Sequence, residues 1–465
     1  MSKEVRIEKD SMGTMEVPVN AYYGAQTQRA FLNFPISRHK MPKMMIHALG
    51  EIKRACAVVS GKHGWVDATI ANAIVKAAEE VSEGKWDEQF VVDIYQTGSG
   101  TSSNMNTNEV IANRACEILG KAIGSKHVHP NDHVNYGQSS NDVFPTAMHL
   151  AILQDFQVKL LPALSSLQAS LIKKAKAFDD IVKIGRTHLQ DATPIRMGQV
   201  FSGFAYQIQQ SIERIQYACT SLEELALGGT AVGTGINRPS SMTKEVIAEI
   251  ASRMDLNVRE TPNHFSAQGS KDAVVHASSS LKELATTLMK LANDIRFLSS
   301  GPRCGIGELI LPETQPGSSI MPGKVNPVIA ESLMMICAQV IGYDVTVSVC
   351  NQAGNFELNV MMPAMLYSVL ESSHILQTGI SNFEKRCVQG IEVDQKRCEE
   401  LIELSMSMVT SLAPLIGYDK AAEIAKESHK TGKTVRELCI EKNVLPADQL
   451  KKVLDPRSMT EPNKE

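Results

Sequence analysis

A short polar segment in the second half of the chain carries residues that could do chemistry. Two hydroxyls, Ser318 and Ser319, are followed closely by Lys324 and Asn326, and glycines and prolines interrupt the run. Asn326 followed by Pro327 is typical of a helix start. A helix N-terminus attracts anions, and Lys324 adds a positive charge. The segment therefore predicts a mobile loop that closes on a carboxylate and brings a serine to it, although a polar surface loop ahead of a helix has the same composition.

Three further polar segments also precede helical patterns. Residues 97–106 are rich in glycine, serine and asparagine and lead into a helical pattern at residues 109–119. Residues 137–142 open a first long helical stretch, and residues 185–194 open a second, with Pro194 near its first turn. One such helix start also fits a solvent loop. Four of them around long helices predict one converged site for a small, doubly anionic ligand.

Two other motifs carry less weight. The histidines of residues 127–133 resemble a metallohydrolase motif, but their spacing is one residue too long and no further ligand set follows. A polar loop that can hold an anion is the favoured interpretation, with a metal-dependent hydrolase as the alternative. Residues 228–235 are rich in glycine but lack G-x-G-x-x-G and follow a helix, so they do not predict a dinucleotide fold.

Composition limits the class of protein. The chain has 465 residues, a net charge of −4 and only 5% aromatic residues. The charge argues against a nucleic-acid binder, and the scarcity of aromatic residues favours a helical core over a β-sandwich. The nine cysteines form no C-x-x-C pair, which argues against disulfides, zinc and iron–sulfur ligation. No N-terminal apolar segment and no uninterrupted apolar run of about 18 residues occurs, so we expect a cytoplasmic protein without a membrane span.

The apolar pattern predicts a bundle of long helices. Apolar residues recur at helical spacing over residues 144–181 and 197–227. Residues 281–298 have the alternating three- and four-residue spacing of a heptad seam. The first stretch would be about 60 Å long as one helix, unless Pro162 breaks it. We predict a mixed, mainly helical domain at residues 1–140, a central bundle at residues 141–395 and a small helical domain at residues 396–465.

Together these segments resemble the fumarase/aspartase superfamily of lyases, and within it the class II fumarases. Residues 317–326 match the signature G-S-S-x-M-P-x-K-x-N, and the resemblance runs from Val5 to about Met459. Aspartases share the scaffold, but their usual sequences G-G-A-G-T, S-Q-S-T-N-D and G-A-T-A differ from this chain. Argininosuccinate and adenylosuccinate lyases differ around Lys324. The pieces that best match class II fumarases are residues 95–101, 129–132, 137–142, 185–191 and 228–235.

The resemblance implies a fold and a reaction. The fold is mainly α, with three domains and a central five-helix bundle, and four subunits form a twenty-helix core. This homotetramer builds each active site from three subunits. The reaction is the reversible anti addition of water across fumarate to give (S)-malate through an aci-carboxylate intermediate, a step of the tricarboxylic acid cycle. The partner is therefore a small dicarboxylate, and no metal or organic cofactor takes part.

The resemblance also implies the site residues. Ser318 removes the C3 proton, Lys324 stabilises the dianionic aci-carboxylate, and His188, charged by Glu331, gives a proton to the leaving hydroxide through a water. The implied substrate-binding residues are Ser99, Gly100, Thr101, Ser139, Ser140, Asn141, Thr187, Ser319, Lys324, Val325 and Asn326. The implied second anion site, outside the catalytic pocket, comprises His129, Pro130, Asn131 and Asp132.

Three other functions fit parts of the same sequence. An aspartate ammonia-lyase would use the same scaffold with ammonia in place of water. A metal-dependent hydrolase would use residues 127–133 and would lose activity to chelators. A non-catalytic helical scaffold protein would show no turnover although Ser318, His188 and Lys324 are all present.

Overall fold

The structure, a computed structural model, describes residues 4–462 and is mainly helical, with a few two-stranded sheets. The predicted mainly α fold is confirmed. The described residues divide into two compact units. Unit 1 comprises residues 4–162, 213–285 and 338–377, and unit 2 comprises residues 163–212, 286–337 and 378–462.

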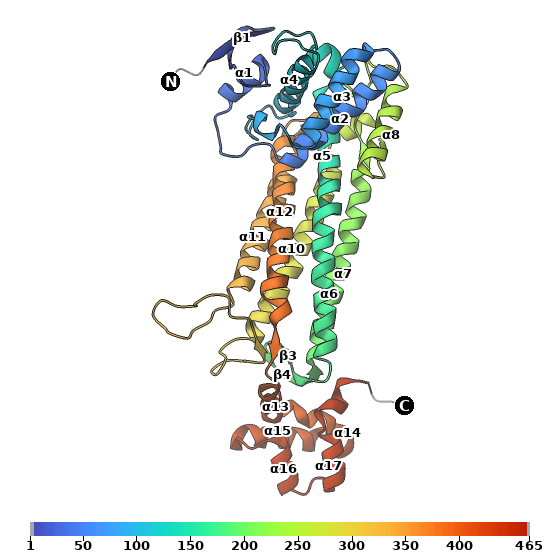
Figure 1. The fold of residues 1–465 in the computed structure, drawn as a ribbon. Coiled ribbons are helices and arrows are strands. Elements are labelled where there is room, and N and C mark those ends of the chain that lie inside the picture. Colours follow the sequence, from blue (N-terminus) through green and yellow to red (C-terminus); the bar gives the residue numbers. More distant parts are fainter. Residues whose placement is uncertain (1–3, 463–465) are drawn as a thin grey trace. The chain divides into compact units, whose positions relative to one another are not determined.

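Unit 1 is built around α2 (Lys43–Lys62), which lies beside α3 (Ala68–Ser82) in Figure 1. Apolar residues recur along α2 at helical spacing, and Met45, Leu49 and Ile52 are fully buried, so this face joins the core. The other elements of unit 1 are β1 (Val5–Asp10), β2 (Gly13–Pro18), α1 (Ala25–Asn33), η1 (Asp87–Gln89), α4 (Thr101–Ile118), η2 (Pro130–Val134), α5 (Ser140–Asp155), η3 (Phe156–Leu160), β5 (Glu224–Leu225), α8 (Met242–Met254), β6 (Arg259–Glu260), α9 (His264–Gly269), β8 (Gly354–Asn355) and β9 (Leu358–Asn359).

The last helices of unit 2 enclose a core of their own, in which Leu412, Val435, Leu438 and Leu454 are buried. The three predicted domains, with boundaries at residues 140 and 395, stay a prediction. Unit 2 contains nearly all of α6 (Leu161–Ala177) and the elements β3 (Val182–Thr187), β4 (Gln190–Arg196), β7 (Leu309–Ile310), η4 (Val388–Gly390), β10 (Glu392–Val393), α13 (Gln395–Leu404), η5 (Met406–Ser411), α14 (Ala413–Ile416), α15 (Tyr418–Thr431), α16 (Val435–Glu441), α17 (Ala447–Val453) and η6 (Pro456–Thr460).

Four long helices have residues in both units: α7 (Met197–Leu222), α10 (Asp272–Leu298), α11 (Val328–Asn351) and α12 (Met362–Arg386). The predicted heptad seam lies on α10, where its apolar residues from 281 to 295 are buried and the last, at 298, is partly exposed. The predicted long helices are therefore present.

Pro162 does not break the first long helical stretch. α5 continues through η3, a π-helical turn, directly into α6. Pro162 comes just after this π-helical turn, and such a turn lets a continuous helix accommodate a residue that disturbs its regular hydrogen-bond ladder.

Two predicted helix starts are wrong. Residues 185–194 were expected to open α7, but they form most of the antiparallel hairpin β3–β4, and Pro194 lies in β4. Both strands of a two-stranded sheet are edge strands, and proline is tolerated on an edge strand. The helix after the first polar segment begins at Thr101, well before residue 109, because that segment itself supplies the first turns of α4.

By length and composition alone, α11 is the one helix among residues 4–462 that could cross a membrane, with a mean hydropathy of 1.7 over its most apolar part. Asp344 in this helix is buried and accepts hydrogen bonds from Ser278 Oγ and Lys282 Nζ. Since a buried carboxylate with two protein partners marks packing against protein, this part of α11 belongs to the core of unit 1. The absence of a membrane span stays a prediction.

Candidate functional site

The first polar segment forms the entry to α4. Gly100 is the N-cap, with a φ of +73°, and a Cβ there would lie 2.1 Å from the ring of Phe144. Glycine suits this position because of both its conformation and the space. Ser99 Oγ and Thr101 Oγ1 lie 2.8 Å apart and share a hydrogen bond. Two predicted substrate-binding hydroxyls are thus fixed together at a helix N-terminus, where an anion is favoured.

The second polar segment caps α5. Ser139 is the N-cap and forms a capping box with Asp142. The buried Asp142 carboxylate also accepts hydrogen bonds of 2.9 Å from the backbone N–H groups of Gly228 and Thr230. The Asn141 side chain donates to the backbone carbonyl of Ala231 at 2.8 Å. The glycine-rich turn that begins at Gly228 therefore lies against the start of α5.

A buried polar network joins these two segments. Asn104 Nδ2, on α4, donates to Ser140 Oγ at 3.1 Å and to Asn135 Oδ1 at 3.3 Å. Asn135 Oδ1 also accepts from Lys53 Nζ at 2.8 Å, and Gln138 Oε1 accepts from the same ammonium at 2.9 Å. Lys53 is completely buried, and burial lowers its pKa to about 7. Lys53 could not be identified from the sequence, because it stands inside the helical pattern of α2 with no motif beside it.

The predicted second anion site surrounds the start of η2. His129 Nδ1 accepts hydrogen bonds from the backbone N–H groups of Asn131 at 3.3 Å and Asp132 at 3.1 Å. The same ring nitrogen lies 3.2 Å from Asp132 Oδ2. The adjoining cavity, of about 260 Å³, has both cationic and acidic walls and is lined by His129, Pro130, Asn131, Lys9, Lys126, Glu8, Asp10 and Glu109 among others.

Thr187 and His188 stand at the tip of the β3–β4 hairpin. His188 and Leu189 form its two-residue turn, with φ values of +56° and +60°. Residues other than glycine and asparagine rarely adopt this conformation, which costs on the order of 1 kcal/mol or more for each residue. The side chains of Thr187 and His188 are exposed. The hairpin thus presents His188 on a strained turn and Thr187 directly before it.

The Ser318 segment is a closed loop. Ser318 Oγ accepts hydrogen bonds from the backbone N–H groups of Ile320 at 3.2 Å and Met321 at 2.9 Å. Asn326 Nδ2 donates to the carbonyl oxygen of Gly317 at 2.6 Å, so the two ends of the segment are tied together. Two N–H donors on one serine oxygen stabilise negative charge that develops there.

The helix after this loop begins slightly later than predicted. The backbone N–H of Glu331 donates to the carbonyl of Pro327 at 3.1 Å, so Pro327 and not Asn326 accepts the first helical hydrogen bond of α11. Asn326 as the N-cap was wrong because its side chain bonds to the Ser318 loop. Glu331 stands in the first turn of α11, where the helix dipole stabilises a carboxylate.

The predicted site residues fall into two groups. The hydroxyl and amide groups of α4 and α5 belong to unit 1, and the His188 turn and the Ser318 loop belong to unit 2. Within unit 2, as far as the chain is described, no hydrogen bond or ion pair joins His188 to Ser318, Lys324 or Glu331. The predicted proton donor, His188, and its predicted carboxylate, Glu331, are therefore not paired within unit 2 of a single chain.

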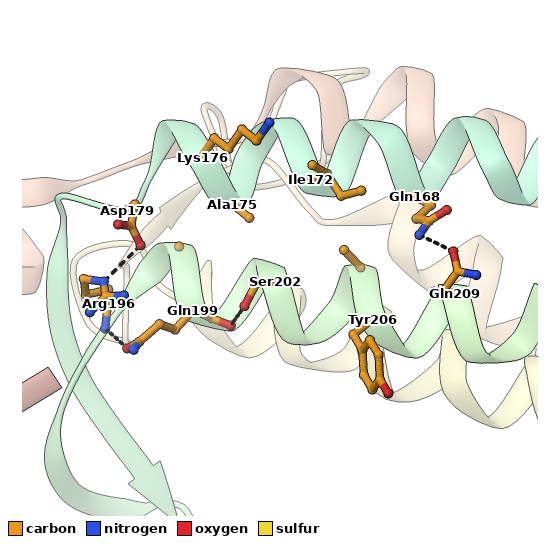
Figure 2. A pocket seen from close by; sticks show the side chains of 12 residues that line it. Gln168, Ile172, Ala175, Lys176, Asp179, Arg196, Gln199, Ser202, Tyr206 and Gln209 are labelled. Carbon is orange, nitrogen blue, oxygen red and sulfur yellow. Dashed lines mark hydrogen bonds and ion pairs between the residues drawn. The ribbon is translucent and has the colours of Figure 1, made fainter. Parts of the chain in front are cut away.

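A separate groove of about 680 Å³ lies between α6 and α7 within unit 2 (Figure 2). An ion pair between Arg196 and Asp179, 2.9 Å long, stands at one end, and Gln168 donates a 2.6 Å hydrogen bond to Gln209 at the other. The predicted site residues do not line this groove.

Metal ligation and thiol chemistry find little support in residues 4–462. No group of three or more His, Cys, Asp or Glu side chains in that range could hold a metal ion. Cys304 is exposed and the other cysteines are buried. Burial raises the pKa of Cys56 to about 12, so this thiol is far from forming a thiolate.

Comparisons with known proteins decide the family. Residues 13–342 match the family described as Lyase, and residues 408–461 match the family described as Fumarase C C-terminus. The chain is 50% identical over 455 residues to a Ralstonia nicotianae protein named Fumarate hydratase class II. This match covers 98% of this chain and 99% of the relative. The chain belongs to the class II fumarase family. The family predicted from the sequence is thereby confirmed.

Two further relatives agree with this chain, one in sequence and one in fold. The Dictyostelium discoideum protein named Fumarate hydratase, mitochondrial is 50% identical over 458 residues, covering 98% of this chain and 94% of the relative. The crystal structure of a recombinant class II fumarase from Schistosoma mansoni matches with a TM-score of 0.96 and 39% identity, covering 99% of this chain and 100% of that one.

Proposed function

We propose that this protein catalyses the reversible hydration of fumarate to (S)-malate. The observation that carries this proposal is identity of about half of all residues, over nearly the whole chain, to relatives named fumarate hydratase. The anion-favouring helix start at Ser99 and Thr101 agrees with a dicarboxylate substrate. An aspartate ammonia-lyase finds no support in these relatives.

Ser318 is the proposed base. Elimination of water from malate begins with removal of a proton next to a carboxylate, which produces a dianionic aci-carboxylate. The base is the deprotonated oxygen of Ser318, which becomes a neutral hydroxyl when it takes the proton. The N–H groups of Ile320 and Met321 point at Ser318 Oγ and stabilise its negative charge before the transfer. Lys324, in the same loop, then stabilises the aci-carboxylate.

His188 is the proposed proton donor to the leaving hydroxide, through a water, and Glu331 is the proposed carboxylate that charges it. The proposed ligands of the substrate carboxylates and hydroxyl are the groups at two helix starts and two loops: Ser99, Gly100, Thr101, Ser139, Ser140, Asn141, Thr187, Ser319, Val325 and Asn326. His129, Pro130, Asn131 and Asp132 form the proposed second anion site.

The proposed assembly is a homotetramer whose active sites each take residues from three subunits. An exposed face of α11 supports it. Ala338, Gly342, Val345 and Val349 are exposed and recur with steps of four, three and four residues. Val345 is 59% exposed and Val349 55%. An apolar, small-residue helix face of this kind is the surface that a bundle of helices from several subunits would cover.

The proposed enzyme is cytoplasmic, acts in the tricarboxylic acid cycle and needs no metal. Its place in that cycle agrees with relatives that are named mitochondrial fumarate hydratases. The lack of a metal-binding cluster among residues 4–462 is compatible with catalysis by side chains alone.

Proton NMR of fumarate with the purified protein tests the function. We expect rapid formation of (S)-malate and negligible aspartate, in concentrated ammonium buffer as well as without ammonium, and with or without EDTA. Aspartate as the main product would make the protein an ammonia-lyase. Turnover that is lost to EDTA and restored by zinc or iron would favour the metallohydrolase.

A further inference from the structure

The turn that carries His188 needs support from outside its own hairpin. His188 and Leu189 both have positive φ, and neither is glycine or asparagine. Among residues 4–462, β3 and β4 form a two-stranded sheet, and the register shifts between Ile184 and Arg186. A strained turn on such a small sheet persists only where surrounding structure holds it in place.

A buried carboxylate binds two basic side chains of this hairpin close to the turn. The Glu308 side chain is 0% exposed and accepts hydrogen bonds from Nη1 and Nη2 of Arg186, both 3.0 Å long. Lys183 Nζ lies 3.2 Å from the same carboxylate. Two parallel charge-assisted hydrogen bonds fix direction as well as distance. Arg186 stands on β3, two residues before His188, so its hydrogen bonds with Glu308 fix the backbone next to the strained turn.

Glu308 is itself held on both sides. Its backbone N–H donates to the carbonyl of Leu298, at the end of α10, at 2.8 Å, and its carbonyl accepts from the backbone N–H of Asp394 at 3.0 Å. Arg397 donates to the backbone carbonyls of Gly305 and Ile306, both at 3.0 Å. The carboxylate therefore stands on a backbone that several elements of unit 2 fix.

We propose that Glu308, acting through Arg186, is a positioning residue that holds the His188 turn in its working geometry. It does not touch the substrate. Without the carboxylate, Arg186 and Lys183 would lose their shared partner and repel each other, and the turn would relax toward other conformations. The proposal rests on the proposed function, which assigns His188 the delivery of a proton.

A double-mutant cycle tests the proposal with fumarate hydration as the assay. Glu308→Gln should lower kcat by on the order of 10- to 100-fold with little change in KM, as expected for a small displacement of a reacting group. In the His188→Asn background the same substitution should change kcat by less than about twofold, because its effect passes through His188. Arg186→Lys keeps the charge but loses the two parallel hydrogen bonds to Glu308. It should likewise lower kcat only when His188 is present, and it serves as the second variant if Glu308→Gln does not fold.

Glu384→Gln is the matched control. Glu384 is a buried carboxylate of unit 2 that accepts hydrogen bonds from Ser166 and Ser170. Its substitution should lower thermal stability and leave kcat unchanged. An equal loss of kcat from Glu308→Gln in both backgrounds, or no loss in either, would overturn the positioning role alone. Full turnover in His188→Asn would overturn it together with the proposed role of His188.

Discussion

Asn326 and Gly317 are joined by a 2.6 Å hydrogen bond from the side-chain amide of the first to the carbonyl of the second. The bond ties together the two ends of the segment that carries Ser318 and Lys324. Both groups are therefore kept in one small loop at the entrance to α11. Because two backbone N–H groups of the same loop already point at Ser318 Oγ, the hydroxyl is oriented before any substrate arrives.

Ser318→Ala should lower kcat by on the order of a thousandfold or more, since it removes the proposed base. The fold should be unchanged, as far-UV circular dichroism would show. Ser411→Ala is the control, because Ser411 Oγ donates to the carbonyl of Met408 within η5, away from the Ser318 loop in the sequence. Near-normal turnover in Ser318→Ala would make the assignment of the base wrong.

The two predicted anion sites should differ in their effect on turnover. His188→Asn should lower kcat by on the order of a hundredfold or more, because it removes the proposed proton donor. His129→Asn should leave kcat nearly unchanged, because His129 belongs to the second site. Steady-state kinetics of both variants decide the point, and a large loss of kcat in His129→Asn would contradict the separation of the sites.

Gly100→Ala should destabilise the protein more than Gly432→Ala, although both glycines have a φ of +73°. A Cβ at position 432 meets no atom within 4 Å, so its cost is conformational, about 1 kcal/mol. A Cβ at position 100 would also lie 2.1 Å from the ring of Phe144, which adds about 1–3 kcal/mol of overpacking. Urea unfolding of the two variants measures the difference, and equal losses would mean that Phe144 moves aside freely.

Lys53 should make stability depend on pH in the alkaline range. Burial lowers its pKa from the ordinary 10.5 to about 7 in the folded protein. Between these values the unfolded chain binds the extra proton, so this site raises the free energy of unfolding as pH increases from 7 to 10.5. At about 1.4 kcal/mol per pKa unit the change amounts to a few kcal/mol. Lys53→Met should not show this rise in the free energy of unfolding. Urea unfolding of both proteins at pH 7 and pH 10 measures it, and an equal change of that free energy with pH in the two proteins would contradict the expectation.

The proposed tetramer should be the active form. The exposed apolar face of α11 predicts that dissociation both uncovers Val345 and Val349 and abolishes turnover. Light scattering combined with activity measured over a range of concentrations checks this. An active monomer at assay concentration would rule out both the tetramer and the shared site.

Periodicity allowed the long helices to be predicted, because the apolar residues of α10 alternate at three and four residues and those from 281 to 295 are buried. The His188 turn was predicted wrongly. A two-residue hairpin turn is usually marked by glycine or asparagine, and His188-Leu189 has neither, so the proline that follows suggested a helix start. Lys53 and Glu308 could not be predicted as site-supporting residues. A buried charge is identified by partners that are distant in sequence, and Glu308 meets Arg186 across more than a hundred residues of chain.

Both units are assembled from three separate stretches of chain, and this has a consequence for synthesis in the cell. Unit 1 takes its last stretch from residues 338–377, and unit 2 ends with the C-terminal helices. A chain growing on the ribosome cannot complete the core of unit 1 until residue 377 has emerged, when most of the protein has already been made. We therefore expect early nascent chains to expose the apolar faces of α2 and α5 for a long time, which makes this protein a substrate for chaperones that bind during translation.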